Sequence, residues 1–388
     1  MFYPFQSPDT RRGFLRVMGR LFTVLSLPSL ANANPKPGTH SPNRPAKGNA
    51  MSPKTVTGLR RLGFQWETAD PFLFCVHHED FFPKGNGRLG PDAGLLRGRD
   101  IGQDFTVKDG FRMYHGETIP GFPEHPHRGF ETVTVVQRGM VDHADSLGAA
   151  GRYGGGDTQW MTAGRGVQHS EMFPLLHTGR ENTLELFQIW LNLPAKSKMV
   201  APHFTMLWNE DIPTYATADG KTRVLVVAGR LGDKQAPAPP PDSWAADPGH
   251  ELAIWVADME PGAVWEIPAS AKDVNRTLYF FKGKSLAVAG ENVPPYHAAT
   301  LVSTHGTRVE NGPEKARLLL LQGKPIGEPV VQYGPFVMNT QAEIQQAFDD
   351  FRATRFGGWP WKSSDPTHGD AAVGRFAKHA DGRTEKRG

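Results

Sequence analysis

Short runs of β-branched and aromatic residues, each bounded by glycine, proline or aspartate, constrain the fold of this chain more than any other feature. They begin near residue 55, and the 388 residues include 43 glycines and 33 prolines. Residues 132–136 (TVTVV) are rich in β-branched side chains, and residues 184–193 alternate apolar and polar ones. Further candidate strands are residues 222–228, 252–257, 277–281 and 316–322. Strands this short favour an all-β sandwich or barrel over alternating βαβ units.

Charge and composition exclude several classes of protein. The 43 basic and 40 acidic side chains leave a net charge of +3, so we expect neither a nucleic-acid nor a membrane partner. No apolar run reaches the roughly 18 residues that a membrane-spanning helix needs. The single cysteine, Cys75, excludes an intramolecular disulfide framework and a CxxC zinc site. We expect Cys75 to be a small buried apolar residue.

The N-terminus carries the parts of an export signal. Residues 10–16 (TRRGFLR) precede a moderately apolar stretch and the small-residue sequence Ala31-Asn32-Ala33. The paired arginines resemble the bacterial twin-arginine export signal. We therefore expect a signal peptide over residues 1–33, a disordered linker over residues 34–54, and a periplasmic or secreted protein. The alternative is a basic terminus or a surface-lying amphipathic segment.

One helix is expected near the C-terminus. Thr340 and Glu343 form the pattern of a capping box. An apolar stripe follows at i, i+3, i+4 and i+7, formed by Ile344, Ala347, Phe348 and Phe351. We expect this stripe to pack on the sheet of the first domain, with the acidic pair at residues 349–350 facing away. The polar tail beyond residue 356 is expected to be loosely ordered.

Two pairs of polar residues with alternate spacing point to a metal site. They are His125 with His127 and His169 with Glu171. Alternate residues of a strand face the same side, so each pair can aim at one point. Three imidazoles and a carboxylate suit Fe(II), Mn, Ni, Cu or Zn, and on a six-coordinate ion they leave two positions for substrate and O2. An isolated HxH is more often surface or packing, but two such pairs in one β-rich segment favour a metal site.

The same stretch resembles the pirin family of the cupin superfamily. The resemblance is carried by residues 120–136 (PGFPEHPHRGFETVTVV), 145–148 (DSLG), 155–171 (GGDTQWMTAGRGVQHSE) and 334–351 (GPFVMNTQAEIQQAFDDF), and it extends over residues 59–356. It implies an all-β bicupin, two antiparallel jelly-roll barrels with a C-terminal helix packed on the first. It also implies one divalent metal, with Fe(II) the leading assignment, held in the N-terminal barrel. The ligands that match the family motif are His125, His127, His169 and Glu171.

The resemblance also suggests how the chain is divided. It implies a monomer whose C-terminal barrel, which contains His297 and His305, holds no metal. We expect residues 231–250, a proline-rich insertion, to form a long surface loop of the second barrel. The expected parts are an N-terminal metal-binding cupin (55–200), a C-terminal cupin (201–330), a helix segment (331–356) and a polar basic tail (357–388).

Four other polar residues have simpler interpretations than metal binding. Glu131 occupies the glutamate position of the general cupin motif, and we expect it either to orient an imidazole N–H or to be ordinary polar packing. We expect His77 and His78 to lie at the surface. We expect His143 in a surface turn, with a position lining the barrel mouth as the alternative.

The leading functional hypothesis is a dioxygenase of the quercetin (flavonol) type, an activity associated with several pirin-like proteins. The substrates would be O2 and a small aromatic, flavonol-like molecule whose 3-hydroxyl group loses its proton to Glu171 as general base. Reaction with O2 would then open the ring with loss of carbon monoxide. The alternative is a non-catalytic, metal-dependent redox sensor or protein-binding regulator. A sugar-phosphate isomerase fits poorly, because no basic cluster accompanies the motif.

Overall fold

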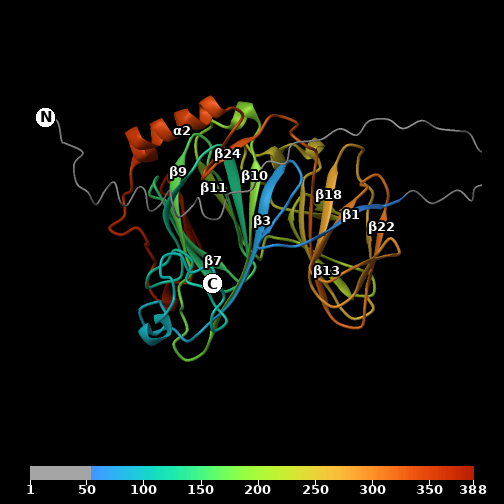
Figure 1. The fold of residues 1–388 in the computed structure, drawn as a ribbon, viewed down its shortest axis with the longest axis horizontal. Coiled ribbons are helices and arrows are strands. Elements are labelled where there is room, and N and C mark those ends of the chain that lie inside the picture. The colour runs from blue at the N-terminus through green and yellow to red at the C-terminus, as the bar shows by residue number, and fades with distance from the viewer. Residues whose placement is uncertain (1–53) are drawn as a thin grey trace, which may run out of the picture. The chain divides into compact units, whose positions relative to one another are not determined.

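The structure is a computed structural model that describes residues 54–388. Every candidate strand is present. They are β5 (Phe130–Arg138), β10 (Asn182–Asn192), β13 (Thr222–Ala228), β16 (Ala253–Met259), β18 (Asn275–Lys282) and β23 (Ala316–Gly323). Of the expected bounds, residue 193 lies just outside β10 and residue 252 just outside β16. The all-β fold of two antiparallel barrels is confirmed (Figure 1). The expected export signal and nearly all of the expected linker lie outside the described residues.

The first barrel consists of two antiparallel sheets. Their strand orders are β11-β8-β5-β10-β3-β2 and β27-β26-β7-β6-β9-β4. The remaining bounds of the former are β2 (Gln65–Trp66), β3 (Phe72–Phe82), β8 (Thr158–Thr162) and β11 (His203–Leu207). Those of the latter are β4 (Gly121–His127), β6 (Met140–Asp145), β7 (Ala150–Gly154), β9 (Val167–Met172), β26 (Arg375–Lys378) and β27 (Thr384–Arg387).

The second barrel pairs a seven-stranded sheet with a four-stranded one. Their orders are β1-β21-β18-β23-β16-β13-β12 and β17-β22-β19-β20. The remaining bounds are β1 (Val56–Arg61), β12 (Thr214–Ala216), β17 (Val264–Ile267), β19 (Leu286–Val288), β20 (Glu291–Val293), β21 (His297–Leu301) and β22 (Thr307–Asn311). Two small hairpins complete the described strands, namely β14 (Arg230–Leu231) with β15 (Lys234–Gln235), and β24 (Val331–Tyr333) with β25 (Phe336–Met338).

Two strands lie on the other side of the expected barrel boundary. β1 precedes the first barrel in sequence but pairs with β21 of the second, and its Val56 packs in the second barrel's core. β11 follows residue 200 but pairs with β8 of the first barrel. The reason is physical: an edge strand joins whichever sheet edge offers unpaired backbone groups, so chain order does not decide its partner.

The two barrels meet through an apolar interface. It arises because alternate residues of a strand point to opposite sides of its sheet. On β5, Val133 and Val135 are in a buried cluster shared with strands of the second barrel, whereas Thr132 and Thr134 face the opposite way. Both threonines are nearly inaccessible to solvent, so their side of β5 is the interior of the first barrel. The first barrel's interior is therefore partly polar. By contrast, the second barrel's interior is filled by apolar residues such as Leu318.

The C-terminal helix α2 (Gln341–Thr354) forms as expected. The Thr340 hydroxyl accepts a hydrogen bond from the Glu343 amide, and the Glu343 carboxylate accepts one from the Thr340 amide. α2 packs on the β24–β25 hairpin, and the single turn η5 (Arg355–Gly357) that follows packs on β9. The expectation that residues 349–350 face away is wrong for Asp350, whose carboxylate accepts a hydrogen bond of 2.7 Å from Arg128.

The tail after η5 is part of the first barrel, which differs from the expected loose order. Trp361 donates from its indole to the Asp145 carbonyl at 2.8 Å, and His368 donates to the His143 carbonyl at 2.7 Å. β26 then pairs with β7. Figure 1 shows this segment, in red, running from α2 along the outside of the barrel. Among the described residues, no helix has the length and apolar character needed to cross a bilayer.

Candidate metal centre

Two neighbouring strands bring the histidines together. β4 pairs antiparallel with β9, and His125 lies directly opposite His169. Residues that face each other across an antiparallel pair project from the same side of the sheet, and so do alternate residues of one strand. His125, His127, His169 and Glu171 therefore share one face. Gly121, at the start of β4, has φ +137°, and an added Cβ would lie 2.5 Å from the Glu171 carbonyl oxygen.

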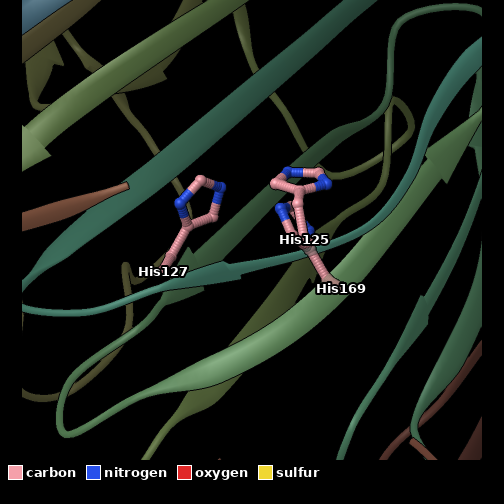
Figure 2. Close-up of side chains that lie close together, drawn as sticks. All are labelled: His125, His127 and His169. Carbon is pink, nitrogen blue, oxygen red and sulfur yellow. The ribbon is translucent and has the colours of Figure 1, made fainter. Parts of the chain in front are cut away.

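The three imidazoles converge on one another. Their candidate ligand atoms all lie within 4.8 Å of one another, and Figure 2 shows the rings projecting into a shared space. The ring centroids of His125 and His169 are 4.4 Å apart. Because imidazole nitrogen binds a first-row ion at about 2.1 Å, small ring rotations suffice for the three side chains to share one ion.

The hydrogen bonding of the cluster leaves nitrogen atoms available for a ligand. His125 donates from Nδ1 to the Pro123 carbonyl at 2.8 Å, which leaves its Nε2 as an acceptor. Neither ring nitrogen of His169 has a hydrogen-bond partner although the side chain is fully buried, and Nδ1 of His127 is likewise buried and unpartnered. Buried polar atoms are normally paired. These unpaired nitrogens fit a site that binds a metal ion.

Burial keeps the cluster neutral. It lowers the pKa of His125 to about 4, and it lowers the pKa of His127 and His169 well below the usual value. Neighbouring imidazoles lower the pKa further: His125 acts on His127, and both act on His169. Neutral imidazole is the form that binds metal, so the three side chains are in the ligating form at neutral pH.

Glu171 lies beside the three-histidine cluster rather than within it. Its Oε2 is 4.0 Å from His169 Nε2. Thr134 donates a hydrogen bond of 3.0 Å to Oε1, and Gln188 donates one of 3.2 Å to Oε2. Burial raises the pKa of Glu171, while these hydrogen bonds act against the increase. Its role as a fourth ligand stays a prediction.

His143 is a buried neighbour of the site, so the expectation of a surface turn is wrong. It lies opposite Glu171 across the β6–β9 pair, and its side chain is fully buried. Its ring centroid is 5.6 Å from that of His169. The sequence carries a signal for this position, because His143 and Asp145 have the same alternate spacing as the two recognised pairs. Sequence alone, however, does not show which strand lies beside β9.

Glu131 does not orient an imidazole. Its carboxylate accepts hydrogen bonds of 2.6 Å from both Thr162 and Ser243, and burial raises its pKa to about 7. Ser243 belongs to the proline-rich insertion, so that segment is anchored against the first barrel instead of forming only a surface loop. The alternative of polar packing describes Glu131 correctly.

The surface positions expected for His77 and His78 are also wrong. His77 Nε2 lies 3.1 Å from Glu185, and His78 Nδ1 lies 2.8 Å from the Tyr114 hydroxyl. Both imidazoles are shielded from solvent by these partners and by aromatic rings. Cys75 is fully buried, as expected.

Comparison with known proteins places this architecture in a family. The family profile described as Pirin matches residues 93–191, and the profile of the Pirin C-terminal cupin domain matches residues 254–357. A Pseudomonas aeruginosa protein provisionally named as a quercetin 2,3-dioxygenase is 39% identical over 239 residues, which is 61% of this chain and 79% of that protein. The chain belongs to the pirin family. All four matched positions of the motif fall inside the Pirin profile.

Relatives outside bacteria and solved structures agree with this assignment. Human pirin is 36% identical over 261 residues, 65% of this chain and 84% of human pirin. A crystal structure of quercetin 2,3-dioxygenase from Acinetobacter baumannii superimposes with a TM-score of 0.60 at 27% identity, covering 78% of this chain and 98% of that one. The pirin-type bicupin fold is thereby established for this chain.

Proposed function

We propose that this pirin-family protein is a metal-dependent dioxygenase of flavonol-type aromatic enols. The observation that carries the proposal is the cluster of buried, neutral imidazoles with unpaired nitrogens, placed beside a buried carboxylate. The names of the Pseudomonas and Acinetobacter relatives support the same reaction class.

The ligands of the metal would be His125, His127 and His169, with Glu171 as the fourth. Fe(II) is our leading assignment, and the same donors accept Ni, Cu, Mn or Zn. A bound ion of this kind supplies Lewis acidity and a redox couple to the pocket. His125 is the partly exposed member of the cluster, so we place the substrate's approach on its side.

Glu171 is the base in this proposal. Burial makes its carboxylate more basic than an exposed one, because the charged form loses solvation. Thr134 and Gln188 fix both carboxylate oxygens, so the base is oriented before the substrate arrives. The carboxylate takes the proton of the substrate's enolic hydroxyl group, and the electron-rich enolate is the species that reacts with O2. CO and a ring-opened product leave.

The test is oxygen consumption with quercetin by protein of known metal content. Glu171→Gln should keep the three imidazoles and a bound metal but lower quercetin-dependent O2 uptake by about 10²-fold or more, the usual contribution of a general base. Glu131→Gln is the matched control, because it neutralises another buried carboxylate of the same barrel that touches no imidazole. Its uptake should be unchanged.

Two results would contradict the proposal. Normal turnover in Glu171→Gln would exclude Glu171 as the general base. A stoichiometric metal ion without any quercetin-dependent uptake in the unmodified protein would exclude flavonol oxygenation.

A further inference from the structure

The second barrel contains a cavity of about 350 Å³ that the metal centre does not use. The ends of strands β16, β18 and β23 form one side, and the proline-rich segment covers the other. Arg276 on β18 lies opposite Gln322 on β23, which in turn lies opposite Ala253 on β16. Two residues further along the same strands are Leu278, Leu320 and Trp255, which belong to the barrel's buried core. Arg276 and Gln322 therefore face the interior of the second barrel.

Arg276 is a buried cation with an unpaired guanidinium nitrogen. Its side chain is 2% exposed, and its Nε donates to the Gln322 side-chain oxygen at 2.7 Å. Nη1 is buried and has no hydrogen-bond partner. Within residues 54–388, no carboxylate forms an ion pair with it. Burial lowers its pKa to about 10, so the guanidinium stays charged at neutral pH.

The polar groups around Arg276 form hydrogen bonds with other residues. The carboxylate of Glu251 accepts hydrogen bonds from the Ser270 hydroxyl and the Ala271 amide. The Gln322 amide donates to the Glu251 carbonyl at 3.1 Å. A buried charge is normally paired. The negative charge of Glu251 raises the pKa of Arg276, but among the described residues Glu251 forms no hydrogen bond or ion pair with it, and Nη1 keeps no partner.

We propose that this cavity binds a small monocarboxylate with an apolar body, whose carboxylate pairs with Arg276. The planar guanidinium matches a carboxylate in geometry. Trp255, Leu252 and Pro268 line the cavity and offer apolar contact to the rest of the molecule. Glu251 and Asp247 also line it, so a multiply charged anion such as phosphate is disfavoured. The site is independent of the metal and of the proposed oxygenation.

The probe is benzoate, titrated calorimetrically into the full-length, metal-loaded protein. Benzamide, which has the same shape without the charge, and inorganic phosphate are the comparison ligands. Arg276→Met should weaken benzoate binding at least tenfold, since it keeps the length of the side chain and removes the charge. Arg223→Met, at an exposed position of the same barrel, should not change it. His169→Ala should also leave it unchanged, which separates this site from the metal centre.

Ala269→Trp provides a test that leaves Arg276 in place. Ala269 lines the cavity at an exposed position, so the new indole should block access and abolish benzoate binding without disturbing the core. If Arg276→Met fails to fold, benzoate binding by Ala269→Trp still tests whether the cavity is the binding site. Three results would overturn the proposal: benzoate affinity unchanged in both variants, benzamide binding as tightly as benzoate, or benzoate binding lost only in His169→Ala.

Discussion

At the residue scale, the first barrel separates two kinds of buried titratable group. Burial lowers the pKa of the three clustered imidazoles and keeps them neutral. It raises the pKa of Glu131 to about 7, although this carboxylate accepts two short hydrogen bonds. The imidazoles have nitrogens without partners, whereas Glu131 has a partner for each oxygen. The three imidazoles, and not Glu131, are therefore suited to bind a metal ion.

His127→Ala should lower the metal content from about one ion per chain to near zero. The variant removes one of three converging nitrogens, and we expect at least a tenfold loss of affinity from the lost donor. Elemental analysis of the purified protein measures this. His78→Ala is the matched control, because it removes another buried imidazole of the same barrel that pairs with Tyr114. Full metal content in His127→Ala would contradict the assigned cluster.

Glu131→Gln should stabilise the protein more at pH 8 than at pH 5. The folded-state pKa of Glu131 is about 7, above the ordinary 4.5. The folded state therefore holds a proton that the unfolded state loses as pH rises from 4.5, and stability falls until pH passes about 7. The shift corresponds to a free energy on the order of 3 kcal/mol. Urea unfolding of both proteins at the two pH values measures the difference, with exposed Glu266→Gln as the control. A pH-independent difference would show that Glu131 titrates normally.

At the scale of elements, the tail after η5 supports the sheet that carries the site. It bonds to the backbone of β6 through Trp361 and His368. The buried Arg152 of β7, which pairs with Asp142, also donates to the tail carbonyls of Gly369 and Asp370. β6 lies beside β9, the strand of His169 and Glu171. The tail lies beyond residue 357, where the match to the pirin C-terminal profile ends.

Deletion of residues 359–388 should lower the free energy of unfolding by about 3 kcal/mol or more. The deletion removes several hydrogen bonds, each of which contributes about 1 kcal/mol, and it exposes the buried Arg152–Asp142 ion pair to solvent. Urea denaturation measures it. A shorter deletion, of residues 381–388, removes β27 but keeps β26, Trp361 and His368, and should cost less. Equal stability of the long deletion and the full chain would show that the tail contacts contribute nothing.

At the scale of the whole molecule, the two barrels share one buried surface. Phe187 of β10 lies 5.1 Å from Phe281 of β18 and 5.9 Å from Trp66, by ring centroids. β1 precedes the strands of the first barrel in the sequence, yet it pairs with β21 of the second barrel. Since neither barrel can leave this surface without exposing apolar side chains, we expect the described region to unfold as one cooperative unit.

Phe187→Ala should lower the free energy of unfolding by about 3–5 kcal/mol, the usual cost of removing a buried aromatic side chain. Chemical denaturation followed by tryptophan fluorescence and circular dichroism should still show a single transition, shifted to lower denaturant concentration. Leu147→Ala, at an exposed position, is the control and should change little. Two separate transitions, with only one shifted, would show that the barrels unfold independently.

Features that depend on residues close together in the chain could be predicted from the amino-acid sequence. Strand positions follow from runs of β-branched residues, the start of α2 follows from Thr340 and Glu343, and the shared face of His125 and His127 follows from the two-residue period of a strand. The family motif added the two-barrel architecture.

Contacts between residues far apart in the chain could not be predicted in this way and are seen in the folded structure alone. The position of His143 opposite Glu171, the bond from Ser243 to Glu131 across 112 residues, and the pairing of β1 with the second barrel all depend on strand order and register. The same is true of Arg276 beside Gln322. Local patterns carry no information on register between distant strands, because it results from packing the two barrels as a whole.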